Sequence, residues 1–222
     1  MNKYLIVVAG GSGKRMGAEL PKQFLELAGK PVLMHTILNF YAFDNSLKII
    51  LVLPENQIDY WQQLIIHHKF SITHQIVAGG TERYYSVKNG LKLVEPDSIV
   101  AIHDGVRPFV SHQTITNCFK TASENGNAVP VIPVSDSVRK IEIASSRIVD
   151  RSKLRLVQTP QVFNSSNIKQ AYENKFSLEF TDDASVLEKE GFIINLVEGN
   201  QENIKITTPF DLILGEALLE EK

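Results

Sequence analysis

Short apolar runs alternate along the first 130 residues with longer segments in which apolar positions recur every three or four residues. The apolar runs predict strands, and the unbroken run at 48–53 (KIILVL) is typical of a strand buried on both faces. The longer segments predict helices, as at 57–68, where Ile58, Trp61 and Leu64 share one face. The predicted strands are 4–9, 48–53, 74–78, 98–102 and 129–134, and the predicted helices are 32–43, 57–68, 83–94 and 111–124.

This alternation predicts an α/β fold of right-handed βαβ units, with a mainly parallel twisted sheet flanked by helices. Ligands bind such sheets at the carboxyl ends of the strands. Three predicted strand ends carry glycine-rich or polar sequence, namely GGSGKR at 10–15, GGTER at 79–83 and HDGVR at 103–107. Their convergence at one edge predicts a binding site there.

The first of these segments has the composition of a phosphate-binding loop. Glycines allow a sharp bend in which backbone N–H groups point at an anion. Lys14 and Arg15 follow at once, and Lys22 stands behind Pro21, so cations are available to neutralise a polyphosphate. An ordinary strand-to-helix turn with solvated basic residues explains the glycines equally well.

Two better-known glycine loops are absent from the sequence. The Walker A pattern ends in Gly-Lys-Ser/Thr, whereas Gly13-Lys14 is followed by Arg15. The dinucleotide fingerprint Gly-x-Gly-x-x-Gly is also missing, because Gly11, Gly13 and Gly17 are spaced one residue too long. This spacing disfavours a nicotinamide-dependent dehydrogenase.

The HDGVR segment supplies the candidate metal ligand. Asp104, opposite a cationic phosphate loop, is placed to hold Mg²⁺ that bridges nucleotide phosphates, although an Asp104–Arg107 turn pair is the simpler alternative. No second histidine or cysteine stands at ligand spacing from His103, which favours a structural histidine. Ser86 has no general base nearby in sequence. Phosphoryl or nucleotidyl transfer by positioning and charge neutralisation fits this inventory.

The alternation breaks after residue 134. Residues 137–150 predict a polar hairpin, with strands at 138–143 and 147–150, that projects as an arm onto a partner subunit. A solvated surface hairpin is the alternative. Residues 158–161 read as a turn. The remaining predictions are helices at 167–172, 182–190 and 210–219, and strands at 193–197 and 203–206.

Composition indicates one globular domain over residues 1–222, with the arm at 137–150. The net charge of −2 provides no cationic field for nucleic acid, and no apolar run approaches the length of a membrane span. Cys118 is the single cysteine, which excludes an internal disulfide and fits a reducing compartment. Because the apolar start is too short for a signal peptide, we expect a cytoplasmic enzyme.

Taken in order, the motifs of the chain resemble those of the 2-C-methyl-D-erythritol 4-phosphate cytidylyltransferases of the non-mevalonate isoprenoid pathway. The resemblance runs from Tyr4 to the last predicted helix and rests on VVAGGSGKRMG, LPKQF, GGTERYYSV, HDGVRPF, VDR, QTPQVF, TDDAS and NIKITTPFDL. It implies a Rossmann-like nucleotidyltransferase fold, a homodimer that exchanges the arm, and a divalent metal. The implied reaction joins CTP and 2-C-methyl-D-erythritol 4-phosphate and releases pyrophosphate.

The resemblance also implies residue roles. Arg15 and Lys22 look like the pair that stabilises the pentavalent transition state, and Arg151 and Lys205 look like the residues that hold the acceptor phosphate. Arg151 follows the arm, so the resemblance places it across the dimer. Asp104 resembles the carboxylate that contacts metal and ribose. The remaining nucleotide and phosphate contacts implied are Ala9, Gly10, Gly11, Gly13, Gly80, Thr81, Ser86, Gly105, Arg107, Ser137 and Thr207.

Three departures from the family pattern leave these charges intact. The chain has Ala9-Gly10-Gly11 where many relatives have Ala-Ala-Gly, HDGVR in place of HDAAR, and Ser137 where a threonine is frequent. Two alternatives remain. Ribitol-5-phosphate cytidylyltransferase shares the glycine loop and NIKITTP but tends to differ in VDR and TDDAS. A nucleotide-binding protein without turnover would lack a transition-state cation.

Overall fold

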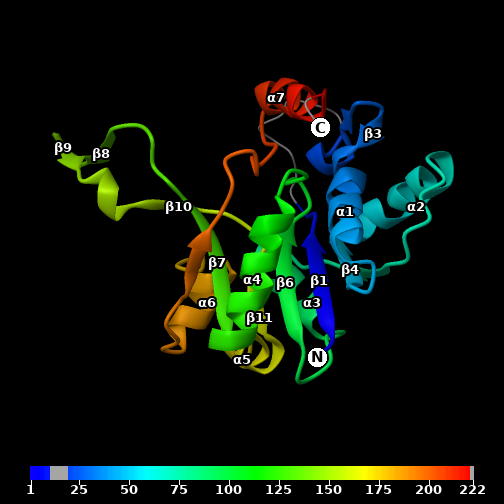
Figure 1. Cartoon of the computed structure of the whole chain (residues 1–222), viewed down its shortest axis with the longest axis horizontal. Coiled ribbons are helices and arrows are strands. Elements are labelled where there is room, and N and C mark those ends of the chain that lie inside the picture. The colour runs from blue at the N-terminus through cyan, green and yellow to red at the C-terminus, as the bar shows by residue number, and fades with distance from the viewer. Residues whose placement is uncertain (11–19, 221–222) are drawn as a thin grey trace.

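The computed structural model describes residues 1–10 and 20–220, and it shows a central sheet with helices on both faces (Figure 1). Within these residues, eight strands form the sheet in the order β10-β7-β11-β6-β1-β4-β5, and β12 pairs with β7. The pairs β1·β4, β1·β6, β4·β5 and β12·β7 are parallel, whereas β11 and β10 run antiparallel to their neighbours. The predicted α/β fold is confirmed.

The elements have the following bounds. The strands of the central sheet are β1 (Lys3–Val8), β4 (Lys48–Leu53), β5 (Gln75–Ala78), β6 (Ile99–Asp104), β7 (Asn127–Pro133), β10 (Arg155–Val157), β11 (Gln161–Asn164) and β12 (Leu196–Glu198). The helices are α1 (Val32–Phe43), α2 (Ile58–His67), α3 (Arg83–Leu91), α4 (His112–Asn125), α5 (Ser165–Ala171), α6 (Asp183–Lys189) and α7 (Pro209–Glu220). Single-turn 3₁₀ helices are η2 (Lys22–Phe24), η3 (Glu55–Gln57) and η4 (Arg151–Lys153), and β2 (Glu26–Leu27) pairs with β3 (Lys30–Pro31).

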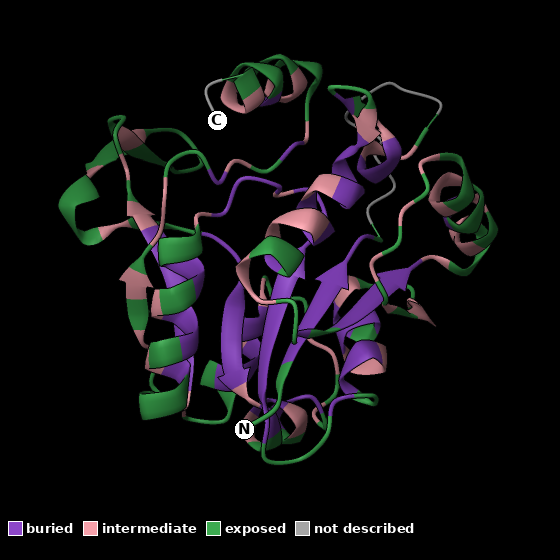
Figure 2. Cartoon of the chain, turned by 45° about the vertical axis from the view of Figure 1, so that its right-hand side comes forward, coloured by how far each residue is buried: buried purple, intermediate pink, exposed green. Residues whose placement is uncertain are grey.

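The apolar core lies on both faces of the central strands, which Figure 2 shows as buried along their length. Successive residues of β1 point to opposite faces, so Leu5 and Val7 pack with α1, α2 and α4, while Tyr4 and Ile6 pack with α3, α5 and α6. Because both faces are covered, the strands read in the sequence as unbroken apolar runs.

Parallel pairing brings the carboxyl ends of four strands to one edge. Val8 of β1 lies in register with Asp104 of β6 and with Val52 of β4, and Leu53 pairs with Ala78 of β5. Gly10, the segment at 79–83 and the segment at 103–107 therefore meet at this edge, as the sequence predicted, whereas residues 11–15 of the first segment lie outside the described residues.

The second half of the chain differs from the prediction in its strands. Residues 161–164 form β11, which lies antiparallel between β6 and β7, whereas the sequence predicted only a turn at 158–161 and no strand here. Residues 203–206, which were predicted as a strand, are irregular backbone in the structure. The strand predicted at 193–197 is shorter and shifted, forming β12 at Leu196–Glu198. Strand β10 was not predicted.

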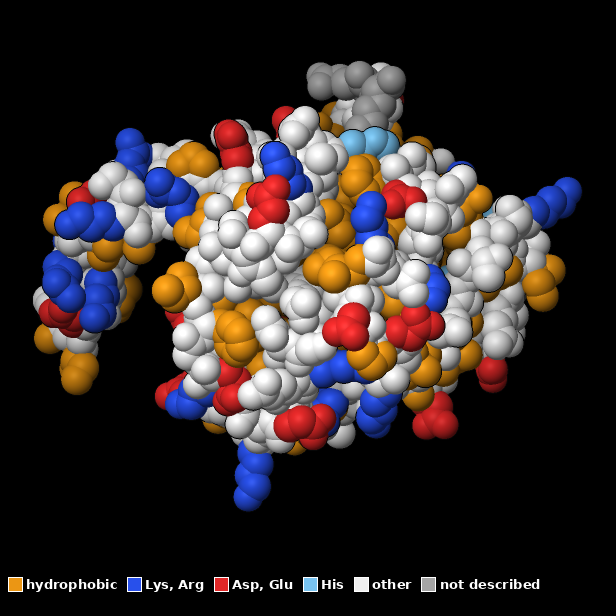
Figure 3. All heavy atoms as spheres, turned by 60° about the horizontal axis from the view of Figure 1, so that its bottom comes forward, with side chains coloured by type: hydrophobic (Ala, Val, Ile, Leu, Met, Phe, Trp, Pro, Cys, Tyr) orange, Lys and Arg blue, Asp and Glu red, His pale blue; other side chains and the backbone are white. Residues whose placement is uncertain are grey.

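The predicted hairpin projects from the domain as its own two-stranded sheet, β8 (Val138–Ile141) with β9 (Ser146–Val149) (Figure 1). Its apolar side chains Ile141, Ile143 and Ile148 are at least 75% exposed. Basic and apolar side chains gather together on this projection (Figure 3). We name residues 137–150 the arm.

Two further features of the domain concern its cysteine and the length of its helices. Cys118 is fully buried on α4, and burial raises the pKa of its thiol to about 12, which makes it a poor nucleophile. Across residues 1–10 and 20–220, every helix is too short or too polar to cross a membrane.

Candidate active site

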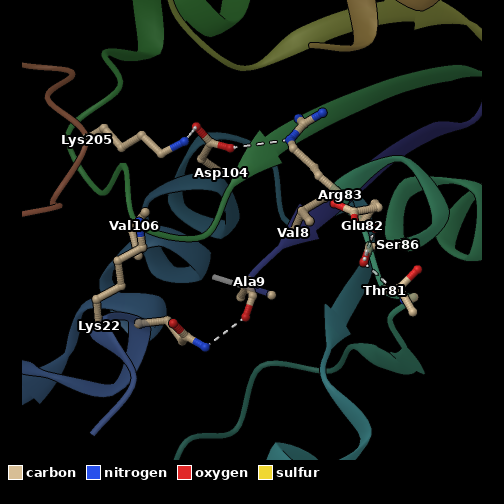
Figure 4. A pocket seen from close by; sticks show the side chains of 13 residues that line it. Val8, Ala9, Lys22, Thr81, Glu82, Arg83, Ser86, Asp104, Val106 and Lys205 are labelled. Atoms are coloured by element: carbon tan, nitrogen blue, oxygen red, sulfur yellow. Dashed lines mark hydrogen bonds and ion pairs between the residues drawn. The ribbon is translucent and has the colours of Figure 1, made fainter. Parts of the chain in front are cut away.

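A pocket of about 290 Å³ opens at the carboxyl ends of β1, β5 and β6 (Figure 4). Most of its walls come from the segments that the sequence singled out. It is lined by Val8, Ala9, Gly10, Lys22, Gln23, Gly80, Thr81, Glu82, Arg83, Ser86, Asp104, Val106 and Lys205.

The end of β1 is held in place from two sides. The N–H of Ala9 donates to the Val52 carbonyl at 3.0 Å, which continues the pairing with β4. The carbonyl of Ala9 accepts from Nε2 of Gln23 at 2.8 Å, and the same Nε2 donates to Gln57 at 2.6 Å. Gln23 is fully buried, so it fixes the pocket wall where β1 ends. Gln23 stands in the quoted LPKQF motif but was not predicted as a site residue.

The 80–86 segment is a turn closed by a serine. The Ser86 hydroxyl accepts from the Gly80 N–H at 3.1 Å and donates to the Glu82 carbonyl at 3.1 Å. A side chain at position 80 would bring a Cβ within 2.3 Å of Tyr85, so only glycine fits there. The hydroxyl of Ser86 is therefore occupied by the main chain, which agrees with its rejection as a nucleophile.

Asp104 lies at the centre of the charged wall. Among the described residues, its carboxylate faces three cations: Lys205 Nζ is 3.0 Å from Oδ2, Arg107 Nε is 3.2 Å from Oδ2, and Arg83 Nε is 3.8 Å from Oδ1. Figure 4 shows Lys205 and Arg83 approaching from opposite sides. Burial alone would raise the pKa of Asp104, but these cations together hold it well below its usual range.

A chain of hydrogen bonds supports Asp104 from behind. Its N–H donates to Thr159 Oγ1 at 3.1 Å, and the Thr159 hydroxyl lies 3.0 Å from Nδ1 of His103. His103 Nε2 lies 2.9 Å from the Arg107 carbonyl, which can only accept. Nε2 therefore carries the proton and Nδ1 accepts from Thr159. His103 is neutral and bound by main chain and threonine, in keeping with a structural histidine.

The neutral state of His103 predicts a pH dependence of stability. Burial lowers the pKa of His103 from 6.5 to about 4, so the unfolded state binds more protons below pH 6.5 and the free energy of unfolding falls as the pH drops toward 4. Lowering the pH from 6.5 to 5 is expected to remove about 1.5 kcal/mol through this group. Burial also lowers the pKa of His74, which adds in the same direction. Denaturant unfolding at several pH values measures the slope.

The matched variant for this prediction is His103→Gln, whose amide can still donate to the Arg107 carbonyl. We expect its free energy of unfolding to depend less steeply on pH between 5 and 6.5. Asp104 does not titrate in this range, because its pKa is lowered from 3.8. Equal slopes for both proteins would contradict the assignment of His103.

Several predicted site residues lie outside the pocket. Gly105 packs beneath it, where an added Cβ would come within 2.9 Å of the Ala9 Cβ, and Arg107 lies behind Asp104, donating to the Asn203 carbonyl at 2.7 Å. Thr207 is bonded to Asp211 at the start of α7. Ser137 and Arg151 are exposed at the base of the arm. Arg15, Gly11 and Gly13 lie outside the described residues.

Arg83 is a lining residue that sequence reasoning missed. It stands in the quoted GGTERYYSV motif, yet only the glycine, threonine and serine of that motif were singled out. Its guanidinium donates to both carboxylate oxygens of Asp183, from NH1 at 2.8 Å and from NH2 at 2.6 Å. Asp183 belongs to the TDDAS motif and lies 100 residues further along the chain. The available signal was its position in the sequence, between Thr81 and Ser86, which the resemblance gave as contacts of the nucleotide.

The described residues of the pocket could bind a divalent cation only if a bound substrate supplied further ligands to it. Nowhere in residues 1–10 and 20–220 do three or more His, Cys, Asp or Glu side chains form a metal-binding group. Mg²⁺ is commonly bound by one or two carboxylates together with substrate phosphates. A single buried carboxylate, Asp104, beside a cationic wall matches that pattern.

The fold and the site together define a nucleotidyltransferase. A doubly covered α/β sheet with a polar, cation-rich pocket at the strand ends suits a nucleotide polyphosphate. Among the described lining residues there is no histidine or cysteine, and the Ser86 hydroxyl is bonded to the main chain.

Comparison with known proteins gives the family. The chain matches the family model described as 2-C-methyl-D-erythritol 4-phosphate cytidylyltransferase over residues 4–221. The protein of that name from Bacteroides thetaiotaomicron is 52% identical over 219 residues, which are 99% of this chain and 100% of that protein. This chain therefore belongs to the 2-C-methyl-D-erythritol 4-phosphate cytidylyltransferase family, and the resemblance noted in the sequence is confirmed.

Solved structures agree over the whole chain. The 2-C-methyl-D-erythritol 4-phosphate cytidylyltransferase from Thermus thermophilus has a TM-score of 0.82 at 31% identity and covers 99% of this chain and 100% of its own. The 4-diphosphocytidyl-2C-methyl-D-erythritol synthase from Anaerococcus prevotii has a TM-score of 0.83 at 29% identity, with coverage of 99% and 96%. The Rossmann-like nucleotidyltransferase fold expected from the sequence is that of its family.

Proposed function

We propose that this chain transfers the cytidylyl group of CTP to 2-C-methyl-D-erythritol 4-phosphate, giving 4-diphosphocytidyl-2-C-methyl-D-erythritol and pyrophosphate for isoprenoid precursors. The observation that carries the proposal is the meeting of Lys22, Lys205 and Asp104 in one pocket with the Gly80–Ser86 turn. The family membership supports the same substrates. The buried lone cysteine supports a cytoplasmic location.

The chemical step needs only positioned charge. An oxygen of the acceptor phosphate attacks the α-phosphorus of CTP, and the bond from that phosphorus to the bridging oxygen breaks as pyrophosphate leaves with the electron pair. Negative charge grows on the phosphoryl oxygens along this path. Lys22 lines the pocket and is assigned to neutralise that charge together with Arg15.

The base and ribose occupy the wall opposite the phosphates in this proposal. The main chain at Ala9 and Gly80, the Thr81 side chain and the turn that Ser86 closes form this wall at the strand end, and the bond from the Gly80 N–H to Ser86 holds the turn in place. A rigid, short turn of this kind selects the small pyrimidine ring over a purine by shape.

Asp104 is the residue assigned to hold Mg²⁺. Its Oδ2 is bonded to Lys205 and Arg107, whereas its Oδ1 has no hydrogen bond from any described residue. When bound, the cation would neutralise the phosphates of CTP. The protein's own part is to keep one carboxylate oxygen presented to the pocket.

The acceptor phosphate is assigned to Lys205, Arg151 and Ser137. Only Lys205 of the three lines the pocket of its own chain. Arg151 begins η4 at the base of the arm, whose apolar side chains are exposed. The exposed apolar side chains support a homodimer in which a second copy of the chain covers the arm, and we assign Arg151 to the partner's pocket.

The experiment that tests the proposal measures pyrophosphate release from CTP and Mg²⁺ with 2-C-methyl-D-erythritol 4-phosphate and, in parallel, with ribitol 5-phosphate. Release with the first acceptor alone is expected. Release with ribitol 5-phosphate instead would keep the cytidylyl chemistry and overturn the acceptor assignment. CTP binding without release for either acceptor would favour a nucleotide-binding protein without turnover.

Replacing Arg151 with alanine is expected to raise the KM for 2-C-methyl-D-erythritol 4-phosphate. Loss of one charge-assisted hydrogen bond to a phosphate is worth about 1.5–3 kcal/mol, or about a 10- to 100-fold increase. The KM for CTP should change little. Steady-state kinetics with each substrate varied in turn measures both constants, and an unchanged KM for the acceptor would remove Arg151 from the site.

A mixing experiment tests whether Arg151 acts across the dimer. The Lys22→Ala and Arg151→Ala chains are each impaired alone. If Arg151 serves the partner's pocket, a mixed dimer has one pocket with both Lys22 and Arg151 intact, and activity returns at an acceptor concentration that saturates the wild type. No recovery after subunit exchange would place Arg151 in its own chain's site or exclude the dimer.

A further inference from the structure

The TDDAS motif distinguished acceptor classes in the sequence, and its Asp183 lies wholly buried with no place in the proposed reaction. Its carboxylate accepts both terminal N–H groups of Arg83, at 2.8 and 2.6 Å, and the Tyr172 hydroxyl at 2.6 Å. The α6 backbone that carries it is fixed by the Asp182 cap and by a 2.8 Å bond from the Ala184 N–H to Gln161. Asp183 is therefore a rigid anion aimed at a pocket residue.

Arg83 stands between two carboxylates. Its outer nitrogens face Asp183, and its Nε faces Asp104 Oδ1 at 3.8 Å, which is longer than a hydrogen bond. Figure 4 shows the side chain reaching along the pocket wall to Asp104. The side chain is about one-third exposed, and the two carboxylates hold its guanidinium from either side.

We propose that Asp183 is a positioning residue that holds the Arg83 guanidinium back from Asp104, so that Oδ1 of Asp104 stays open to the cation that accompanies the nucleotide. Lys205 and Arg107 occupy the other oxygen, Oδ2. Without the charge of Asp183, Asp104 becomes the nearest anion to Arg83, and attraction strengthens as the distance shortens. The guanidinium then closes onto Oδ1 and competes with the cation for it.

This inference rests on the proposed function, since it assigns Asp104 to the cation, but it makes a separate measurable claim about CTP binding. In Asp183→Asn, the amide keeps the size of the side chain and loses the charge. Binding of CTP with Mg²⁺ should weaken about tenfold or more, because the cation loses its charge-assisted contact with Oδ1 of Asp104. Binding of CTP in EDTA should be unchanged or tighter, because the pocket has gained net positive charge.

Two further variants separate positioning from a general structural role. The double variant Arg83→Met with Asp183→Asn removes both charges, and its affinity for CTP with Mg²⁺ should return to within about threefold of wild type. Tyr172→Phe removes one hydrogen bond to the same carboxylate but keeps its charge, so it should bind CTP with Mg²⁺ close to the wild-type affinity.

Isothermal titration calorimetry of the full-length chain with CTP, in MgCl₂ and in EDTA, gives all of these values. Equal weakening in both buffers, or a double variant that binds no better than Asp183→Asn, would overturn the proposal. If Asp183→Asn alone does not fold, the charge-free double variant decides: affinity near wild type in MgCl₂ supports the proposal, and weakening in both buffers overturns it. Pyrophosphate release by the wild type, measured separately, reports on the proposed function and not on Asp183.

Discussion

Replacing Lys22 with alanine is expected to lower kcat by about 10²–10³-fold, the usual effect of removing one group that stabilises transition-state charge. Lys22 begins η2 directly after Pro21 and lines the pocket. In the proposed reaction, its ammonium interacts most strongly with the negative charge that develops as pyrophosphate leaves. The dissociation constant for CTP should therefore rise less than kcat falls.

Steady-state kinetics and calorimetric binding of CTP to the same protein separate the two effects. Lys120, exposed on α4 and away from the pocket lining, gives a matched control, since Lys120→Ala removes a lysine charge without touching the site. Equal losses in kcat and in CTP affinity for Lys22→Ala would show that the residue binds the ground state and would contradict its transition-state role.

Replacing Asp104 with asparagine is expected to lower kcat/KM by about 10³-fold, because bound metal supplies several kcal/mol of charge stabilisation and this carboxylate is assigned to hold it. The change also leaves Lys205, Arg83 and Arg107 facing one another without their shared anion. Removing one partner of a buried ion pair costs about 3–5 kcal/mol, so the free energy of unfolding should fall as well.

Denaturant unfolding and activity must therefore be measured on the same preparation of Asp104→Asn. The control is Asp97→Asn, an exposed aspartate in a left-handed turn that asparagine also adopts readily. Activity that falls only in proportion to the unfolded fraction would reduce Asp104 to a structural ion-pair partner. A folded variant that stays inactive at raised Mg²⁺ concentration supports the assignment.

The first half of the fold could be predicted from sequence because its strands are buried on both faces. The unbroken apolar runs at β1, β4 and β6 indicate strands that are covered by helices on both faces of the sheet. Strand β11 was missed because it has only four residues and is set by its neighbours, pairing with β6 on one side and β7 on the other. Local sequence carries little of that information.

The strand predicted at 203–206 failed for a related reason. Ile206 is fully buried and its N–H donates to the Val106 carbonyl at 2.9 Å, so the apolar side chain points inward as a strand residue's would. Residues 203–206 nevertheless form no strand pairing with the sheet, and the segment crosses the sheet edge as irregular backbone. The alternation of apolar and polar residues that predicted a strand at 203–206 therefore reflects the burial of side chains and not strand pairing.

The candidate site likewise contains residues that the sequence could predict and residues that it could not. Lys22 and Asp104 follow glycine-rich or polar strand ends and could be found by reading along the chain, because the parallel sheet brings those ends together. Lys205 was found only through the family resemblance. The Arg83–Asp183 pair could not, since its members lie 100 residues apart and meet only through the packing of α3 against the α5–α6 region. Gln23 was missed for the same reason, because its partners Ala9 and Gln57 are also distant from it in the sequence.

The place of β11 in the sheet sets an order of assembly during synthesis. Strands β1, β4, β5 and β6 pair with one another and are complete once residue 104 has left the ribosome. Strand β7 comes next in sequence, yet its final position is separated from β6 by β11, which ends at Asn164. The nucleotide wall can therefore form early, while Asp104 acquires Thr159 and Lys205 only near the end of translation. A nascent chain arrested after residue 150 would lack Thr159 and Lys205, and with them the side of the pocket that is assigned to the acceptor.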